Sequence, residues 1–168
     1  MAILKIITQE NPRLRMRAAR VPSVDDSIRR LMDDMVETMV AAPGVGLAAV
    51  QVDVLLRVIV LKVDNQVYQL ANPELVRAEG EQVGYEGCLS IPGMIGEVAR
   101  AERVVARAIN RHGKPVRIKG SGLLARAIQH EIDHLDGILF TDRLTSIDTL
   151  RPVSAEDPAG ADVAEITV

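Results

Sequence analysis

Residues 129–137 contain three side chains that suit a metal site. His130, Glu131 and His134 stand in the H-E-x-x-H spacing. Two histidines four residues apart lie one helical turn from each other on one face, where both can bind one cation. Glu131 beside them could move the proton of a water activated at that cation, which makes a nucleophile at neutral pH. The segment therefore predicts a divalent metal site that performs hydrolysis.

A match to one short motif can also arise by chance. The two histidines would then be surface or core residues, and Glu131 would be a solvated charge on a helix. Apolar residues flank the motif on both sides, however, and two of the three histidines of the chain belong to it. We therefore favour the metal site.

Two histidines leave the metal in need of a third protein ligand. The sequence offers Cys88, Glu86, His112 and Asp136. We rank Cys88 first, because a thiolate binds borderline and soft divalent metals strongly and Gly87 lets the backbone approach closely. A lone cysteine is commonly a small buried apolar residue, and it could instead be a nucleophile activated by histidine. His112 is expected in an exposed hairpin loop, outside the site.

Residues 44–51 combine two glycines, small side chains and a glutamine. Small residues let a ligand approach the backbone, and the amide of Gln51 could donate to a developing oxyanion. A phosphate loop is excluded, because the segment has no G-K-[ST] sequence and no helix follows it. Taken alone, the safer interpretation is the end of a helix followed by a tight turn.

The elements that must position these residues are two helices and a strand-rich middle. Apolar residues from 26 to 42 recur at the spacing of an amphipathic helix, which Pro43 and Gly44 end. A second helix is expected from Ser121, its N-cap, to Gly137. Strand-like runs occupy residues 55–63, 66–71, 98–110 and 115–119. The pattern predicts an α+β fold with mixed or antiparallel sheets wrapped around the helix that carries H-E-x-x-H.

Length and composition narrow the class of protein. The chain has 168 residues, 48% of them hydrophobic, which suits one domain with its own core. A net charge of -3 with both signs interspersed argues against a broad basic surface for nucleic acid or anionic lipid. A single cysteine excludes a disulfide framework, and no apolar run reaches the roughly 20 residues of a membrane span. We expect a cytoplasmic protein with residues 1–150 as the catalytic domain and 151–168 as a loosely ordered tail.

Three segments, in order along the chain, together resemble the signature motifs of the peptide deformylase family. They are Gly44-Val45-Gly46-Leu47-Ala48-Ala49-Val50-Gln51, Glu86-Gly87-Cys88-Leu89-Ser90 and Gln129-His130-Glu131-Ile132-Asp133-His134-Leu135-Asp136-Gly137. Their order and approximate spacing match the family from the start of the chain to about Arg143. Members of this family remove the formyl group from nascent chains that begin with formylmethionine.

The resemblance implies catalytic roles for matching positions. The metal ligands would be one thiolate and two imidazoles, those of Cys88, His130 and His134. Glu131 would be the general base and then the acid, while water activated at the metal attacks the formyl carbon and formate leaves. Gln51 and the backbone N–H of Leu89 would hold the formyl oxygen as it becomes an oxyanion.

The resemblance also implies how substrate is held. The substrate-binding positions would be Val45, Gly46, Glu86, Leu123 and Ala127. The backbone of Gly46 would pair with an extended substrate, which gives affinity without reading side chains. An apolar pocket for the methionine side chain would be lined by Val45, Leu123 and Ala127.

The family implies a metal and partners as well. Fe(II) would be the metal, with Zn, Ni or Co as alternatives, and a thiolate beside Fe(II) implies sensitivity to oxygen. The partners would be formylmethionyl nascent peptides, with transient proximity to the ribosome, no nucleic-acid specificity and no membrane. The resemblance leaves monomer and homodimer open.

One departure from the family concerns the setting of Glu86. Many members carry an Arg seven residues after the cysteine that pairs with this acidic position, where the chain has Ile95. Arg100 is a candidate replacement. Arg126 lies either near the substrate side of the site or on the solvated face of its helix.

Other functions fit the sequence less well. A generic H-E-x-x-H metallopeptidase would need a third ligand after the helix, where only Asp136 and Asp142 are available. A non-catalytic metal-binding module would want a fourth protein ligand. A hydrolase with a cysteine nucleophile would keep its activity after chelation of metal.

Overall fold

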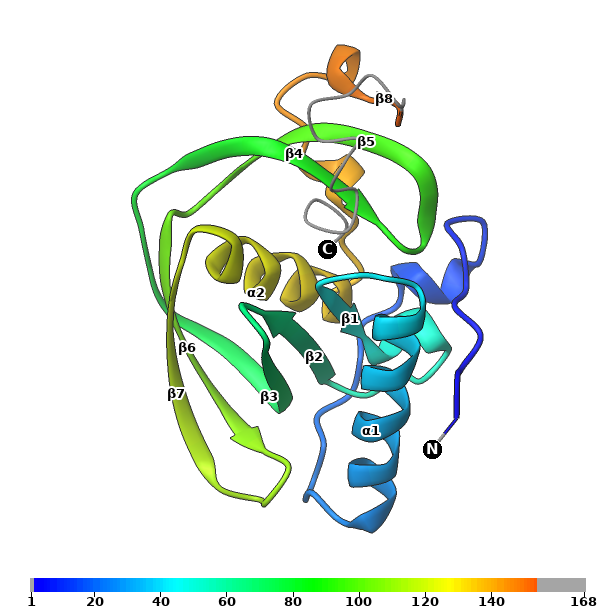
Figure 1. Ribbon diagram of the computed structural model, residues 1–168, viewed down its shortest axis with the longest axis vertical. Coiled ribbons are helices and arrows are strands. Elements are labelled where there is room, and N and C mark those ends of the chain that lie inside the picture. Colours follow the sequence, from blue (N-terminus) through cyan, green and yellow to red (C-terminus); the bar gives the residue numbers. More distant parts are fainter. Residues whose placement is uncertain (1, 154–168) are drawn as a thin grey trace.

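The structure is a computed structural model that describes residues 2–153 (Figure 1). Its two α-helices are α1, Asp26–Ala41, and α2, Gly122–Leu135. Short 3-10 helices cover Pro12–Arg15, Ala49–Val52, Phe140–Arg143 and Ile147–Thr149. Within the described residues, no helix has both the length and the apolar content to cross a membrane.

Two antiparallel sheets make up most of the remainder. The larger has the strand order β1-β2-β3-β6-β7 and the smaller β4-β5-β8. The strands are β1 Gly46–Ala48, β2 Val58–Val63, β3 Gln66–Glu79, β4 Gln82–Cys88, β5 Ile91–Arg100, β6 Arg103–Asn110, β7 Pro115–Ser121 and β8 Arg151–Pro152. Helix α2 lies between the hairpin of β4 and β5 and the larger sheet (Figure 1). The predicted α+β fold, with sheets around the helix that carries H-E-x-x-H, is confirmed.

Helix α1 has the predicted boundaries to within one residue. It begins after Asp25, whose side chain accepts a hydrogen bond from the N–H of Ile28 and so caps one of the free donors of the first turn. Its buried stripe contains Ile28, Met32, Met35 and Met39, which pack with residues of β1 and β2 in one hydrophobic cluster. The methionines at helical spacing are therefore core residues, as predicted.

Helix α2 is buried along most of its length. Ala125, Ala127, Ile128 and Leu135 join Val104, Ala106 and Ala108 of β6 in a second cluster. Ser121 holds the predicted N-cap position, although its side chain makes no capping hydrogen bond. The chain turns away at Gly137, with φ of 77°, where an added Cβ would lie 2.5 Å from the backbone oxygen of Arg15. Only glycine fits both the backbone angle and the space.

The strands were predicted less well than the helices. Residues 98–110, expected as one run, form the end of β5 and all of β6, with a turn at Ala101 and Glu102. Strand β3 continues from the predicted 66–71 to Glu79, and β2 begins only at Val58. Strands β1 and β4 and the first half of β5 were missed, because these segments are rich in glycine, which has a low strand propensity.

A short strand ends the described part of the chain. Arg151 and Pro152 form β8, which pairs with Ile95 and Met94 of β5. The first residues of the predicted tail are thus held by the smaller sheet. The rest of that tail, residues 154–168, lies outside the described residues.

Candidate metal and catalytic site

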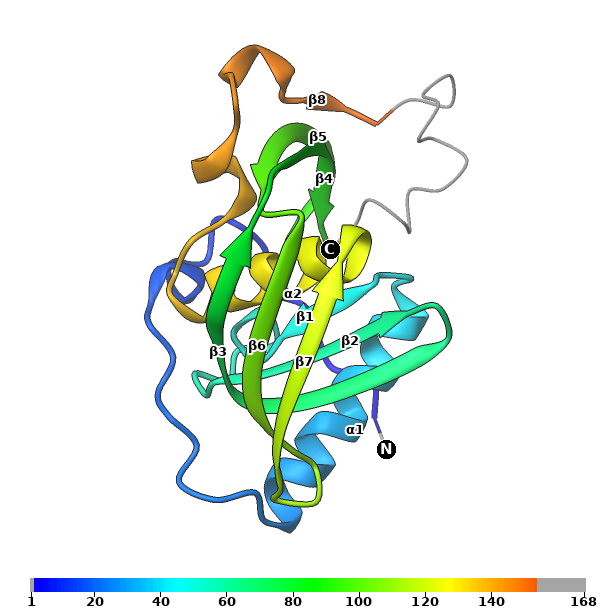
Figure 2. The same cartoon turned by 90° about the vertical axis from the view of Figure 1, so that its left-hand side faces the viewer.

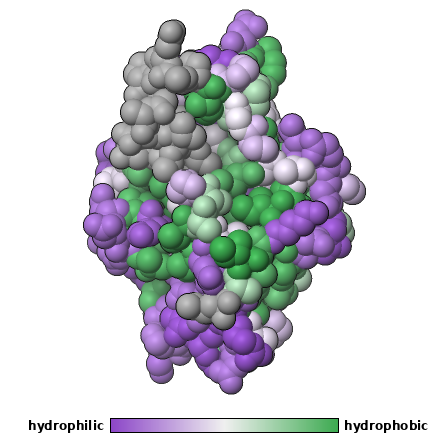
Figure 3. Space-filling model, turned by 45° about the vertical axis from the view of Figure 1, so that its right-hand side comes forward, coloured by the Kyte–Doolittle hydropathy of each residue, from purple (hydrophilic) through white to green (hydrophobic). Residues whose placement is uncertain are grey.

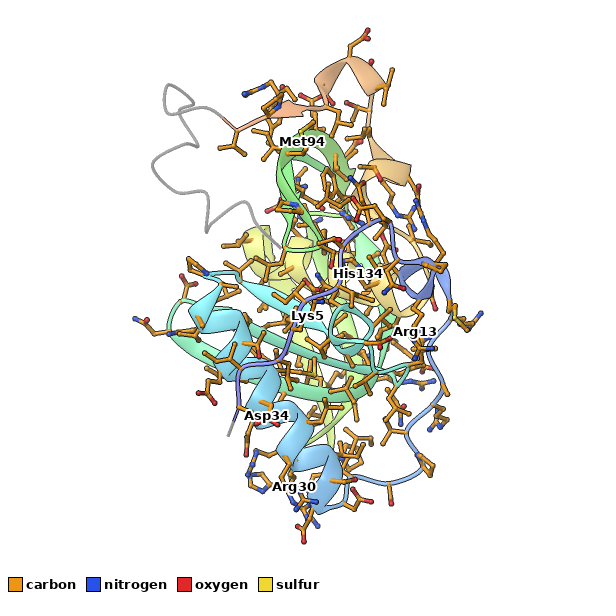
Figure 4. The ribbon with its side chains drawn as sticks, turned by 90° about the vertical axis from the view of Figure 1, so that its right-hand side faces the viewer. Lys5, Arg13, Arg30, Asp34, Met94 and His134 are labelled. Atoms are coloured by element: carbon orange, nitrogen blue, oxygen red, sulfur yellow. The ribbon has the colours of Figure 1, made fainter. Side chains whose placement is uncertain are left out.

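Strand β4 and helix α2 bring one sulfur and two nitrogen atoms together. The Sγ of Cys88, at the end of β4, lies 3.3 Å from Nε2 of His134. The Nε2 atoms of His134 and His130 are 3.2 Å apart. The possible ligand atoms of these three buried side chains all lie within 4.8 Å of one another. Figure 4 shows His134 deep in the middle of the molecule.

Among residues 2–153, this is the one group of three His, Cys, Asp or Glu side chains placed to hold a metal. The other candidates from the sequence lie elsewhere. His112 is exposed in the turn between β6 and β7, as predicted. Asp136 is paired with Arg57 at 2.9 Å, and Asp142 is paired with Arg15. Neither acid is therefore a free third ligand after the helix.

Three polar atoms at the site of Cys88, His130 and His134 lack hydrogen-bond partners among the described residues. Both carboxylate oxygens of Glu131 and the Nδ1 of His134 are buried without a hydrogen-bond partner among the described residues. Burial raises the pKa of Glu131 well above its ordinary value, and the charge of Glu86 raises it further. A buried carboxylate without a partner costs free energy. A cation with a water molecule would supply partners for the two oxygens of Glu131.

The protonation states of the ligands also fit a cation. Burial lowers the pKa of His134 well below its usual value, so its imidazole is neutral, the form that binds metal. Burial raises the pKa of the Cys88 thiol, and the Glu131 charge raises it further. A nucleophilic cysteine needs a lowered pKa, which this environment opposes. A directly bound divalent cation is the group that would stabilise the thiolate here.

Gln51 points its amide at the same group. Its Oε1 accepts from the backbone N–H of Ala48 at 2.9 Å, and its Nε2 donates to Oγ of Ser90 at 3.1 Å. Nε2 also lies 3.6 Å from Sγ of Cys88. Because both ends of the amide are held, the donor is fixed beside the predicted ligand.

Gly46 lies directly against Glu131. An added Cβ would overlap the carboxylate and would stand 2.9 Å from its Cδ. The backbone of residues 44–51 therefore comes close to the helix that carries H-E-x-x-H. A residue larger than glycine at position 46 would not allow this contact.

Glu86 holds His130 in place. The Nδ1 of His130 lies 2.8 Å from one oxygen of Glu86, which leaves Nε2 facing Cys88 and His134. Arg100 binds both carboxylate oxygens, at 2.8 and 2.9 Å, and Arg126 donates to one of them at 2.5 Å. Burial alone would raise the pKa of Glu86, but hydrogen bonds from Arg100 and His130 outweigh it and hold the pKa below its ordinary range.

These contacts answer two questions left by the sequence. Arg100 does pair with Glu86, while Ile95 is buried and apolar. Arg126 is neither solvated nor free, because its guanidinium is buried against Glu86. The side chain of Glu86 is 0% exposed, so we assign it the orientation of His130 rather than contact with substrate.

The remaining predicted substrate positions border the hydrophobic cores. Ala127 is buried in the cluster of α2 and β6, and Val45 packs against that cluster. Leu123 is half-buried in the first turn of α2, and the side chain of Leu89 packs against the cluster of α1. Apolar side chains also gather in the middle of the face shown in Figure 3.

Two residues of the site were missed by sequence reasoning. Ser90 is buried and holds the amide of Gln51. Asp133 accepts from Arg100 at 2.6 Å and from Arg143 at 2.7 and 3.0 Å, and so extends the ion pairs of Glu86 to the surface. The signal for Asp133 was available: an acidic residue three positions after His130 in a largely apolar helix needs a partner.

The chain is similar to known proteins over most of its length. A family model described as polypeptide deformylase matches residues 3–149. A peptide deformylase of Symbiobacterium thermophilum is 55% identical over 171 residues, which cover 99% of this chain and 77% of the relative. One from Thermomicrobium roseum is 49% identical over 173 residues, which cover 98% of each.

Solved structures agree in fold. The peptide deformylase of Thermotoga maritima superimposes with a TM-score of 0.85 at 36% identity, over 87% of this chain and 100% of that chain. That of Ehrlichia chaffeensis in complex with actinonin has a TM-score of 0.85 at 39% identity, over 89% and 92% of the two chains.

Proposed function

The chain belongs to the peptide deformylase family, whose members remove the N-terminal formyl group from nascent peptides, and we propose how its own residues do so. The chain is accordingly a metal-dependent hydrolase. The ligands we propose are Cys88, His130 and His134, with Glu131 as base and acid. The observation that carries this assignment is the buried, unpartnered carboxylate of Glu131 beside the three ligand atoms. The catalytic domain we propose is residues 1–150.

Glu131 is the proton carrier. Cys88, His130 and His134 would hold a divalent cation, which would supply a positive charge for the substrate oxygen and a water whose pKa is lowered to about 7. Glu131 takes the proton from the attacking water as the water oxygen bonds to the formyl carbon. It then gives that proton to the amine nitrogen as the carbon–nitrogen bond breaks and formate leaves. Burial raises the pKa of Glu131, so this carboxylate is a stronger base than an exposed one when it accepts the proton of the water.

Gln51 and Leu89 stabilise the oxyanion in this proposal. The amide of Gln51 and the backbone N–H of Leu89 donate to the formyl oxygen as negative charge develops there. The amide needs little reorganisation, because Ala48 and Ser90 already hold both of its ends. Preorganised donors of this kind contribute about 10²- to 10³-fold to kcat.

An extended substrate is proposed to pair with Gly46. Strand β1 ends the strand order of the larger sheet and pairs with β2, so among the described residues its second edge has no strand beside it. Addition of a peptide strand at such an edge gives affinity from main-chain hydrogen bonds. Val45, Leu123 and Ala127 would receive the methionine side chain.

The metal we propose is Fe(II), with Zn, Ni or Co as alternatives that the same ligands can bind. One thiolate and two imidazoles form a borderline donor set, and a thiolate beside Fe(II) makes the enzyme sensitive to oxygen. We also propose the cytoplasm as its location, since nascent chains emerge there.

The test is formate release from a formylmethionyl dipeptide by protein purified without oxygen. Glu131→Ala should abolish release while metal content is retained, and Glu37→Ala, on α1, is the matched control that should remain active. An active Glu131→Ala variant would refute the assignment. Cleavage of internal bonds in an unformylated peptide would instead support a general metallopeptidase, for which Asp136 and Asp142 are poorly placed because each is paired with an arginine.

A further inference from the structure

The outer face of β3, β6 and β7 gathers basic side chains. The inner face of this sheet packs on α2 through Val104, Ala106 and Ala108, so the alternate residues point outward. The sheet faces the viewer in Figure 2, with α2 behind it. The outward basic residues are Arg77, Arg103, Arg107, Arg117 and Lys119.

Two hollows lie on this side of the molecule. One, of about 630 Å³, is lined by Arg17, Arg20, Arg57 and Arg107, with the acids Glu74 and Asp136. The other, of about 340 Å³, is lined by Arg77, Arg103 and Lys119, with the acid Glu79. The hollows and the outward strand positions together contain eight basic residues, which we call the basic face: Arg17, Arg20, Arg57, Arg77, Arg103, Arg107, Arg117 and Lys119.

The basic face carries an excess of positive charge. Its eight cations meet three acids, and each acid is already engaged: Glu74 with Arg107 at 2.7 Å, Asp136 with Arg57 at 2.9 Å and Glu79 with Arg77 at 2.6 Å. Within residues 2–153, Arg20 and Arg117 make no ion pair. The whole chain has a net charge of -3, so this excess is a local property.

The strand register makes the excess costly. Arg107 and Arg117 are directly opposite each other on β6 and β7, and both side chains are exposed on the same face. Like charges in such a pair destabilise a sheet. Glu74 already offsets the charge of Arg107, so the charge that remains without a partner among the described residues is that of Arg117. An anion beside Arg117 would relieve the remaining repulsion, which indicates a face suited to a negatively charged partner.

We propose that the basic face binds the phosphate backbone of structured RNA. Seven of its eight cations are arginines, whose planar guanidinium pairs with phosphate oxygens through two hydrogen bonds. The face spans about 13 Å from Arg103 to Arg107 along β6 at roughly 3.3 Å per residue, with a hollow near each end. Binding through phosphates carries no base specificity.

RNA fits better than a lipid surface for two reasons. The arginines line hollows, which suit projecting phosphates more than a flat bilayer. The family acts on nascent peptides, which emerge from an RNA-containing machine, and in this respect the inference rests on the family activity. The sequence predicted no broad basic surface, because these charges are dispersed from residue 17 to residue 119 and only the fold assembles them.

The basic face lies on the far side of α2 from the metal ligands. Ile128 and Leu135 of α2 face the sheet, whereas His130 and His134 face Cys88 on β4. RNA bound to the outer face of the sheet would therefore leave the catalytic site open to a peptide.

The test is fluorescence anisotropy of a labelled RNA hairpin of about 20 base pairs, longer than the roughly 16 that a double-stranded RNA-binding domain covers. The metal-loaded enzyme is titrated between about 50 mM and 200 mM salt. The variant is Arg20→Gln with Arg117→Gln. The matched control, Lys5→Gln with Arg30→Gln, removes two exposed charges seen from the opposite side of the molecule (Figure 4).

Wild type should bind with an affinity that falls steeply with salt. The variant should weaken binding roughly 60-fold at 0.1 M salt and reduce the slope of log K against log salt by about 2, since each phosphate contact contributes about 0.9. Arg20→Lys with Arg117→Lys should retain most of the slope. All variants should hydrolyse the formylmethionyl dipeptide at the wild-type rate, so failure of the RNA proposal is distinguished from failure of the active-site assignment.

Three results would overturn the proposal. The first is no binding of the hairpin by wild type, and the second is an equal loss in the control and the variant. The third is tighter binding to vesicles of equal parts phosphatidylglycerol and phosphatidylcholine than to RNA, which would assign the face to a membrane.

Discussion

Replacement of Glu86 by glutamine tests whether the buried ion pairs orient the metal site. The change preserves shape but removes the one negative charge that Arg100, Arg126 and His130 share. The guanidiniums of Arg100 and Arg126 are only 3% and 7% exposed, so water cannot replace the lost carboxylate. Among the described residues, Asp133 remains as the one other acid bound to Arg100.

The expected loss of stability is large. Breaking a buried ion pair by removing one partner costs about 3–5 kcal/mol. In a chain of this length, each kcal/mol lowers Tm by about 2–4 °C, so Tm should fall by roughly 6–20 °C. Metal affinity should fall about 10- to 100-fold, because the group that orients His130 is weakened.

Scanning calorimetry and metal competition measure the two effects. The matched control is Glu74→Gln, which breaks a Glu–Arg pair of 2.7 Å whose carboxylate is 50% exposed. An exposed pair contributes about 0–1 kcal/mol, so this control should change Tm little and leave metal affinity unchanged. Equal effects of the two variants, or wild-type metal affinity in Glu86→Gln, would refute the role of Glu86.

Three further predictions concern the catalytic groups. Gly46→Ala should cost about 1–3 kcal/mol in the free energy of unfolding and lower kcat, because its Cβ displaces the Glu131 carboxylate; denaturant unfolding and formate release test both. Gln51→Leu should lower kcat about 10²- to 10³-fold with metal retained, and an unchanged kcat would remove Gln51 from the oxyanion site. Chelation of the metal should lower stability by about 3–4 kcal/mol if the ion was present at roughly 100 to 1,000 times its Kd, so an unaltered Tm in calorimetry would contradict a tightly held ion.

Elements that depend on interactions between near neighbours in the sequence were predicted more accurately than elements that depend on interactions between distant residues. Helix α1 was found to within a residue because its apolar stripe repeats over four turns. Strands β4 and β5 were not, since Gly84, Gly87 and Gly93 interrupt the alternation and only pairing in the hairpin makes them strands.

The residues of the site show the same difference between short-range and long-range interactions. His130 and His134 lie one turn apart within a single helix, so their spacing alone predicts that they share a face. Cys88 depends on a strand more than 40 residues away from them, and sequence alone left it one candidate among four. The partners of Glu86 required coordinates, because two arginines from different elements converge on it.

Glu86 and Glu131 are both 0% exposed, yet the fold gives them opposite properties. Hydrogen bonds from Arg100 and His130 overcome the burial of Glu86 and keep it charged. Glu131 has no hydrogen-bond partner among the described residues, and the charge of Arg100 lowers its pKa less than burial raises it. A pair of carboxylates whose pKa values are pushed apart marks different roles. Glu86 can hold an imidazole in place but cannot exchange protons near neutral pH. Glu131 can take up a proton and release it, and this contrast is the physical reason for placing the acid–base chemistry there.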